Sequence, residues 1–363
     1  MVRGFSENNY TVSVVCPLPN YPQGRVFKGY KGGFYKKEKT DFGKINRLWI
    51  LPSNSSNKFV RLLSMLSFSF SLTLFLVFTK SPKKIIIQYS PVFTGFTSVF
   101  WAKLFGKKII LNVSDLWPLA GLEMGILNKG MYYTILLKME RFCYRKSHLI
   151  LGQSEEILHH IKKIEIDKPM FLYRNFPDFT PPEIVEIPNE KKPIKIVYAG
   201  LLGVAQGILK ICNEVEFTKE VQLHIYGNGP ETEKAKSLKK ENIFYHGELD
   251  REILHQELQK YNLGFVPLTN RIYGSVPSKI FELSRVGLPI LYFAGGEGEL
   301  IVKDFNLGWV IPVNNLKEFQ LFINSLTSEN LLEFSKKEIQ KTAITNFNFR
   351  TQFEELIDIV DKY

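Results

Sequence analysis

Short, almost continuously apolar runs alternate along the chain with longer stretches that have helical spacing. Residues 85–87 and 263–266 are examples of such runs. Continuous rather than alternating apolar patterning is typical of strands buried on both faces, as in parallel sheets covered by helices. The alternation of strands and helices therefore predicts an α/β fold with doubly wound sheets. Strands are expected at residues 10–16, 84–90, 108–113, 147–152, 169–173, 194–199, 221–226, 243–246, 263–267 and 289–293.

A proline-rich segment divides the chain into two parts. Five prolines lie between residues 175 and 193, namely Pro177, Pro181, Pro182, Pro188 and Pro193. Prolines at this density break both helices and strands, and 363 residues are too many for one comfortable core. We therefore expect an N-terminal domain over residues 1–175, a linker over residues 176–193 and a C-terminal domain over residues 194–343.

One apolar segment allows three interpretations. Residues 62–78 carry no charge, and Arg61 and Lys80 flank them. A membrane-spanning helix needs about 20 mainly apolar residues, and this run is shorter and contains five serines and threonines. The hydroxyl groups fit a buried helix or a helix that lies at a membrane interface, and a spanning helix is the third possibility.

The positive charge of the chain is concentrated in its first half. The formal net charge is +11, with 26 lysines and arginines against 11 acidic residues in residues 1–180, and 21 against 25 in residues 181–363. This asymmetry indicates an anionic partner for the first half, either a membrane surface or nucleic acid. The simpler explanation is a lysine-rich proteome. The sequence lacks the motifs of zinc fingers, helix-turn-helix proteins and RNA-recognition domains, so nucleic acid is the weaker choice.

Cysteine and histidine usage argues against disulfides and metal sites. The three cysteines, Cys16, Cys143 and Cys212, are far apart, and the six histidines form no cluster with metal-ligand spacing. This pattern fits a reducing compartment and predicts that no metal is bound. Arg3, Glu7 and Asn8 near the start also argue against a cleavable signal peptide, so a cytoplasmic location is expected.

The first candidate for chemistry is the segment 194–207. An expected strand ends there in a turn with Gly200, Gly203 and Gly207, and a helical stretch follows. Such a turn can present backbone N–H groups to a phosphate. The spacing is not that of the dinucleotide-binding or P-loop motifs. An ordinary tight turn between a strand and a helix explains the pattern equally well.

The second candidate is the segment 273–289. Pro277 and Ser278 predict the start of a helix, and Gly287 with the proline two residues later predicts its end. Helical spacing places Lys279 within one turn of Glu282. A hydroxyl and an ammonium at a helix start suit a diphosphate, and a carboxylate suits a pair of ribose hydroxyls. A capped amphipathic helix with a Lys–Glu surface pair is the alternative.

Together these segments resemble the retaining nucleotide-sugar glycosyltransferases of family four. The matching segments of the C-terminal half are 198–207, 226–230, 244–247, 277–282, 287–290 and 296–301. The N-terminal half is similar to a bacterial branch that acts in O-antigen, capsule and exopolysaccharide assembly and includes N-acetylfucosamine transferases. Its matches are Pro17-Leu18-Pro19-Asn20-Tyr21-Pro22-Gln23-Gly24, Ser90-Pro91, Asn112-Val113-Ser114-Asp115-Leu116-Trp117-Pro118 and Gly125.

The resemblance implies a fold, an activity and a location. The fold would be GT-B, with two Rossmann-like domains whose parallel sheets face across a cleft, and with residues 344–363 packing back onto the N-terminal domain. The activity would be transfer of a sugar, with retention, from a nucleotide-diphosphate donor to a lipid-linked glycan acceptor in surface polysaccharide synthesis. The enzyme would need no cofactor or metal. It would lie on the inner face of the bacterial plasma membrane, bound to the anionic surface through its basic N-terminal domain.

The resemblance also implies roles for particular residues. Glu282 would hold the nucleotide ribose, and Lys279 would lie by the diphosphate. Asp115 would be an acceptor-side catalytic or positioning residue, although an aspartate there could instead cap the turn at residues 116–121. The remaining donor-binding residues would be Gly203, Gln206, Gly207, Gly247, Pro277 and Ser278.

The sequence departs from the family pattern in three places. Gly274 stands where the first glutamate of the Glu-x7-Glu motif is expected, and Val204 replaces an arginine of the diphosphate loop. Residues 2–9 resemble the end of the first helix of the fold, so an opening strand-loop-helix unit is expected to be missing, through a misplaced start or a truncated gene. The missing glutamate and the missing unit make a non-catalytic remnant that binds membranes or a partner one alternative. A sugar-nucleotide epimerase of the same fold is another, although the segment 114–118 and the basic N-terminal half disfavour it. Nucleic-acid binding through the N-terminal half is a third alternative, but no nucleic-acid partner is expected.

Overall fold

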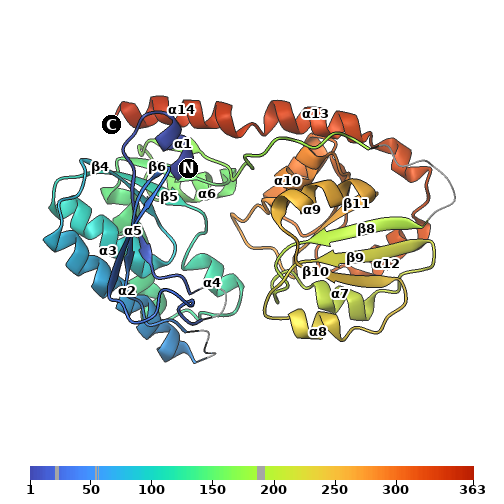
Figure 1. Cartoon of the computed structure of the whole chain (residues 1–363), viewed down its shortest axis with the longest axis horizontal. Helices are drawn as coiled ribbons and strands as arrows, with labels where there is room; N and C mark the ends of the chain where they lie inside the picture. The colour runs from blue at the N-terminus through green and yellow to red at the C-terminus, as the bar shows by residue number, and fades with distance from the viewer. Residues whose placement is uncertain (21–23, 54, 56, 186–192) are drawn as a thin grey trace. The chain divides into compact units, whose positions relative to one another are not determined.

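The computed structural model describes residues 1–20, 24–53, 55, 57–185 and 193–363. The chain forms two compact units (Figure 1). Unit 1 consists of Met1–Arg174 and Thr351–Tyr363, and unit 2 consists of Asn175–Arg350. Part of the expected linker and residues 21–23 of the first family segment lie outside the described residues.

Unit 2 is built on a six-stranded sheet in which every pair of neighbouring strands is parallel. The strand order is β10-β9-β8-β11-β12-β13, so the order reverses between β8 and β11. In open parallel sheets, ligands bind at the carboxyl ends of the strands beside such a reversal. The strands are β8 (Ile194–Ala199), β9 (Val221–Tyr226), β10 (Ile243–Gly247), β11 (Leu263–Pro267), β12 (Ile290–Phe293) and β13 (Gly308–Val310).

Helices supply the crossovers that parallel strands require. Two apolar clusters cover the two faces of the sheet, and the side chains of β8 alternate between them. Ile196 and Tyr198 belong to one cluster, and Val197 and Ala199 belong to the other. The helices of unit 2 are α7 (Ile208–Glu214), α8 (Thr232–Lys236), α9 (Arg251–Glu257), α10 (Lys279–Val286), α11 (Glu297–Asp304), α12 (Leu316–Ser325) and α13 (Lys336–Asn346), with short 3₁₀ turns at Leu258–Lys260 and Asn330–Glu333.

Unit 1 contains two sheets. A parallel four-stranded sheet has the order β4 (Lys84–Gln88), β5 (Lys108–Val113), β6 (Leu149–Gly152) and β7 (Met170–Leu172). A three-stranded sheet has the order β1 (Ser13–Pro17), β3 (Gly43–Leu48) and β2 (Tyr35–Thr40). The helices are α1 (Val2–Glu7), α2 (Lys58–Phe78), α3 (Val92–Leu104), α4 (Leu119–Glu123), α5 (Met131–Lys146), α6 (Glu155–Lys162) and α14 (Phe349–Asp361).

The C-terminal helix α14 ties the two sheets of unit 1 together. The Asp361 carboxylate accepts a hydrogen bond of 2.6 Å from the Tyr10 hydroxyl, three residues before β1, and lies 3.4 Å from Nζ of Lys84 in β4. Phe353 is 2% exposed, and its ring meets that of Phe5 edge to face at 4.9 Å. Among the described strands, β1 and β4 are each paired along one edge only, so α14 bridges two sheet edges.

The predicted fold class is confirmed, because α/β architecture with parallel sheets is present in both units. A strand is found at each of the ten expected positions, with ends that differ by a few residues. Three further strands, β2, β3 and β13, were not expected. The β2–β3 pair is antiparallel, and β2 is lysine-rich and largely exposed, so it shows no continuous apolar run.

We expect Phe353→Ala to destabilise unit 1 by about 3–5 kcal/mol, because it removes a buried ring that packs against α1. Amide hydrogen exchange measures this directly: protection in β5 and β6 should fall, while protection in β8 and β11 should stay unchanged. Glu354→Ala, at an exposed position of the same helix, is the matched control. Equal loss of protection in both units would contradict the assignment of α14 to unit 1.

Candidate functional site

The loops at the carboxyl ends of β8, β9 and β10 interlock. Leu202 donates its backbone N–H to the Asn228 carbonyl at 3.0 Å, and Gly227 donates to the Gly247 carbonyl at 2.7 Å. Gly227 has a φ of +136°, and a Cβ atom on it would lie 1.8 Å from the Gly200 carbonyl oxygen. Only glycine fits this close approach of two backbones. The two loops are therefore held at van der Waals distance.

The turn after β8 contains three of the predicted donor-binding residues. Gln206 and Gly207 both donate backbone N–H groups to the Gly203 carbonyl, at 3.2 and 3.4 Å. Gly207 has a φ of +63°, and α7 starts at the next residue. The Oε1 atom of Gln206 is buried, and none of the described residues donates a hydrogen bond to it. A buried oxygen without a donor is a group that a ligand or a water molecule can satisfy.

The predicted helix at residues 279–286 is present as α10. Ser278 occupies the N-cap position, but its hydroxyl makes no capping hydrogen bond. The Pro277 carbonyl accepts from the Ile280 N–H at 3.1 Å. The helix ends at Gly287, which has a φ of +88° as expected for a helix-terminating glycine. Both predicted ends of this helix are therefore confirmed.

Glu282 is a buried carboxylate with several polar and charged partners. The residue is 7% exposed, so the alternative of a Lys–Glu surface pair is wrong. Oε2 lies 2.7 Å from Nζ of Lys279, and Oε1 accepts a hydrogen bond of 2.9 Å from Nε2 of His255. The Nε atom of Arg251 lies 3.5 Å from the same Oε1. Burial raises the pKa of the carboxyl group, but the His255 hydrogen bond and the charges of Lys279 and Arg251 outweigh it, and the pKa is lowered to about 2.

His255 and Arg251 were not identified from the sequence. They lie one turn apart on α9, and the aromatic ring of Phe179 supports both. The rings of His255 and Phe179 stack at 3.9 Å, and the Arg251 guanidinium lies 5.8 Å from the Phe179 ring centre. The spacing of four residues places the two side chains on one helix face, but it does not reveal which carboxylate they meet.

The structure brings the predicted donor-binding residues of unit 2 together at the carboxyl ends of the sheet strands. A Cβ atom on Gly200 would lie 3.9 Å from Cε of Lys279, so α10 starts beside the turn after β8. Gly247 is bonded to Gly227 in the neighbouring loop, and no atom lies within 4 Å of where its Cβ would be. The turn, the start of α10 and an open glycine backbone therefore form one surface beside the strand reversal.

Asp115 belongs to unit 1 and follows β5. Helix α4 starts at Leu119 with Pro118 as N-cap and no side-chain cap, so the alternative role of Asp115 as a helix cap is wrong. Burial raises the pKa of its carboxyl group. Polar side chains at the same strand ends form a chain: Asn112 donates to Gln88 at 2.7 Å, and Gln88 donates to Ser114 at 2.6 Å.

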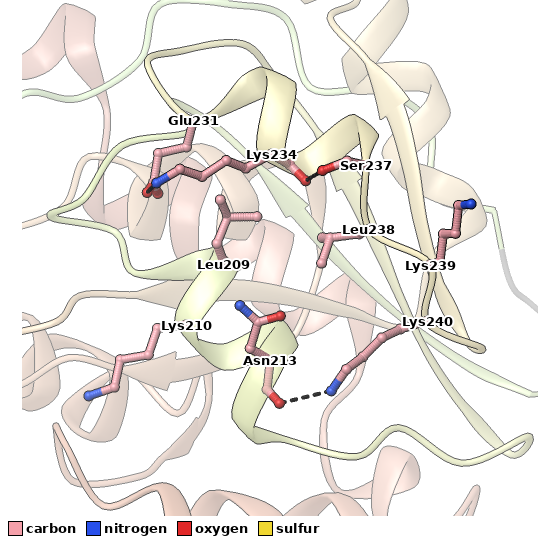
Figure 2. Close-up of a pocket in the computed structure, with 9 residues that line it drawn as sticks. All are labelled: Leu209, Lys210, Asn213, Glu231, Lys234, Ser237, Leu238, Lys239 and Lys240. Atoms are coloured by element: carbon pink, nitrogen blue, oxygen red, sulfur yellow. Dashed lines mark hydrogen bonds and ion pairs between the residues drawn. The ribbon is translucent and has the colours of Figure 1, made fainter.

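A hollow of unit 2 also lies away from these residues. A volume of about 570 Å³ opens between α7 and α8 (Figure 2), and its lining contains none of the predicted donor-binding residues. Nζ of Lys240 donates a hydrogen bond there to the Asn213 backbone carbonyl, and Nζ of Lys234 lies 3.6 Å from Oε1 of Glu231. A much smaller hollow, of about 10 Å³, is lined by Gln206 and Gly207. In the parts of the chain that the structure describes, no three His, Cys, Asp or Glu side chains gather to hold a metal ion.

Comparisons with known proteins agree on the fold. Residues 193–329 match the family model described as Glycosyl transferases group 1, so a domain of this type makes up most of unit 2. No curated protein sequence matches the chain. Three similar solved structures show that the chain has the GT-B fold.

The first of these structures is sucrose-phosphate synthase from Thermosynechococcus elongatus, with a TM-score of 0.73, 13% identity, and coverage of 99% of this chain and 90% of that one. The second is HepE from Anabaena in complex with UDP, with a TM-score of 0.67, 11% identity, and coverage of 97% and 100%. The third is the lipopolysaccharide outer core galactosyltransferase WaaB in its apo form, with a TM-score of 0.60, 17% identity, and coverage of 98% and 100%.

A histidine pair lies on β9 and β10, next to the same loops. Nδ1 of His224 lies 2.9 Å from Nε2 of His246, and the two rings are stacked. Burial lowers the pKa of His224 to about 4, helped by the nearby His246 and Lys195. Burial also lowers the pKa of His246. The pair is therefore neutral in the folded protein at neutral pH.

We expect the stability of unit 2 to decrease as the pH falls from about 6.5 to about 4. Folded His224 binds a proton more weakly than His224 in the unfolded chain, so acid favours unfolding, with a loss of about 2–3 kcal/mol over this range. Urea unfolding of unit 2 at several pH values measures the effect. His224→Gln should flatten the pH dependence, and His159→Gln, at an exposed position of unit 1, should not. The same slope in wild type and His224→Gln would refute this origin.

Proposed function

We propose that the protein is a glycosyltransferase that moves a sugar, with retention, from a nucleotide-diphosphate donor to a lipid-linked glycan acceptor in bacterial surface polysaccharide synthesis. The observation that carries the donor assignment is the buried, ionised Glu282 at the start of α10, beside the glycine turn after β8. The family match over unit 2 supports glycosyl transfer. The UDP held by HepE supports a nucleotide donor, and the lipopolysaccharide acceptor of WaaB supports a surface glycan.

In this proposal, Glu282 holds the donor ribose. A carboxylate offers about four lone-pair positions. Hydrogen bonds from Lys279 and His255 take two of them, and Arg251 lies at ion-pair distance, 3.5 Å from Oε1. The remaining positions can accept hydrogen bonds from two ribose hydroxyls. His255 and Arg251 keep the carboxylate ionised and fix its orientation. Gly247 and its neighbours would border the base, because no side chain covers that backbone.

The diphosphate would lie between the turn after β8 and the start of α10. Lys279 supplies a positive charge, and Ser278 supplies a hydroxyl that makes no capping bond. Pro277 fixes the backbone before the helix, and Gly203 and Gln206 would contribute groups from the opposite side. Positioning and stabilisation of the departing diphosphate would then supply most of the catalysis. With retention, the acceptor attacks from the face that the diphosphate leaves, so no protein nucleophile is required.

Unit 1 would bind the acceptor. Asp115 follows a buried strand, and the raised pKa of its carboxyl group suits a residue that receives a proton from an acceptor hydroxyl. We place the protein on the cytoplasmic face of the bacterial plasma membrane, where basic residues of unit 1 meet anionic lipid and a lipid-diphosphate-linked glycan. No metal or cofactor takes part in this scheme.

Calorimetry with UDP and UDP-N-acetylhexosamines tests the donor site. Glu282→Gln keeps the shape of the side chain but weakens two hydrogen bonds to ribose, so we expect UDP to bind about 10- to 100-fold more weakly. Glu233→Gln, on the exposed face of α8, is the matched control and should bind UDP like the wild type.

A thermal melt of each variant accompanies the calorimetry, because Glu282→Gln also removes the ionised partner of Lys279, His255 and Arg251. Unchanged UDP binding by a folded Glu282→Gln variant would overturn the assignment of Glu282. Absence of UDP binding by the folded wild-type protein would overturn the proposed donor site as a whole.

A further inference from the structure

Helix α2 presents its large apolar side chains to solvent. Phe59 is 78% exposed, Phe70 is 60% exposed and Phe78 is 81% exposed. These residues and the other exposed ones recur every three or four positions, so they form one face of the helix. The outward face contains Phe59, Leu63, Leu66, Phe70, Leu74 and Phe78.

The inward face of α2 carries hydroxyl groups instead. The Ser67 hydroxyl accepts a hydrogen bond of 2.9 Å from the Leu51 N–H, and the Thr73 hydroxyl accepts one of 3.1 Å from Nε1 of Trp101. Phe68 and Leu72 pack between these polar positions against β3. A surface helix in water has the opposite arrangement, with apolar residues inward and polar residues outward. The interpretation of residues 62–78 as a buried helix is therefore wrong.

By length and composition, α2 is the one helix among the described residues that could cross a membrane, and 17% of its apolar window is buried. A spanning helix would be surrounded by lipid or by other spanning helices. One face of α2 is instead held against the rest of unit 1, through contacts of Ser67, Phe68, Leu72 and Thr73. This arrangement leaves a single apolar face for a partner.

The apolar surface continues onto the end of α3. Helices α2 and α3 pack side by side in unit 1 (Figure 1). Trp101, which bonds to Thr73, stacks on Phe105 at 5.5 Å, and Phe105 is 40% exposed. Leu104 is 63% exposed on the same helix end. The outward face of α2 and this end of α3 are called the apolar platform below.

The part of the sequence that contains the apolar platform carries only positive charges. Residues 42–114 contain ten lysines and arginines and no acidic residue. Exposed lysines lie at the ends of α2 and α3, including Lys80, Lys83 and Lys103. Within the described parts of the chain, none of these three lysines pairs with a carboxylate. A broad apolar face with basic residues at its rim fits an anionic lipid surface.

We propose that the apolar platform lies in the plane of an anionic lipid bilayer, with the outward side chains of α2 in the acyl boundary and the lysines at the headgroups. The inference deepens the proposed function and rests on it for the lipid-linked acceptor, which such a surface would bring to unit 1. Binding to lipid itself needs neither donor nor acceptor. The two proposals can therefore be tested separately.

The test is co-sedimentation of the full chain with vesicles, either of pure phosphatidylcholine or of equal parts of phosphatidylcholine and phosphatidylglycerol. We expect strong binding to the anionic vesicles. Leu63→Gln with Phe70→Gln should lower the partition coefficient about 100-fold, about tenfold for each apolar side chain lost. Leu321→Gln with Leu332→Gln, at equally exposed apolar positions of unit 2, is the matched control and should bind like the wild type.

A second pair of variants tests the charge. Lys80→Gln with Lys83→Gln should weaken binding to anionic vesicles about fivefold for each lysine, and should weaken its dependence on salt. Binding to pure phosphatidylcholine should not change. Equal binding of this variant and the wild type to anionic vesicles would overturn the role of the basic rim.

Three results would overturn the inference. The first is failure of the wild-type protein to bind anionic vesicles. The second is self-association, seen by analytical ultracentrifugation and lost in the Leu63/Phe70 variant, which would make the platform an interface between copies. The third is retention in membranes after an alkaline carbonate wash, which would make α2 a spanning helix. UDP calorimetry on the same samples separates the proposals. UDP binding without vesicle binding overturns this inference and the membrane placement but leaves the donor site intact, and vesicle binding without UDP binding overturns only the donor site.

Discussion

Parallel strands cannot be joined by tight hairpins, and much of this molecule follows from that constraint. Each strand of unit 2 must be followed by a segment that returns over one face of the sheet, so both faces are covered and the strands become apolar throughout. The same constraint brings all strand ends to one edge, where the turns after β8, β9 and β10 meet. The edge is crowded enough that Gly227 and Gly200 touch through their backbones. A surface of backbone and short polar groups is the result.

The buried carboxylate of Glu282 adds an electrostatic requirement to this edge. A charge removed from water must be paired, and here the partners come from α9 and from the first turn of α10. The aromatic ring of Phe179 in turn contacts the His255 and Arg251 side chains of α9. The ionised Glu282 side chain thus links α9 and α10, and through α9 it links both helices to the segment that contains Phe179. Such a site is rigid before a ligand arrives, which lowers the entropy cost of binding.

Buried strands could be predicted from the sequence. Exposed strands, and contacts between residues that are far apart in the sequence, could not. The ten expected strands have apolar residues on both faces, whereas β2 is a lysine-rich edge strand and β13 has three residues. The grouping of Ser278, Lys279 and Glu282 could be predicted because these residues lie within about one turn of one helix. His255 pairs with Glu282 across 27 positions of sequence, and only the packing of α9 on α10 reveals it. The sequence did not predict which face of α2 points outward. In our proposal the apolar residues of α2 face lipid, and apolar spacing alone does not distinguish a lipid-facing side from a core-facing one.

Unit 1 is made from both ends of the polypeptide, and this has a consequence for biosynthesis. Domains usually fold in the order in which they leave the ribosome. Residues 351–363, which bridge Tyr10 and Lys84, are the last part of unit 1 to be made, after the whole of unit 2. Until then β1 and β4 lack this bridge, and the Phe5 ring lacks its partner on α14. During synthesis, unit 1 therefore spends the time needed to translate about half of the chain as an incomplete domain.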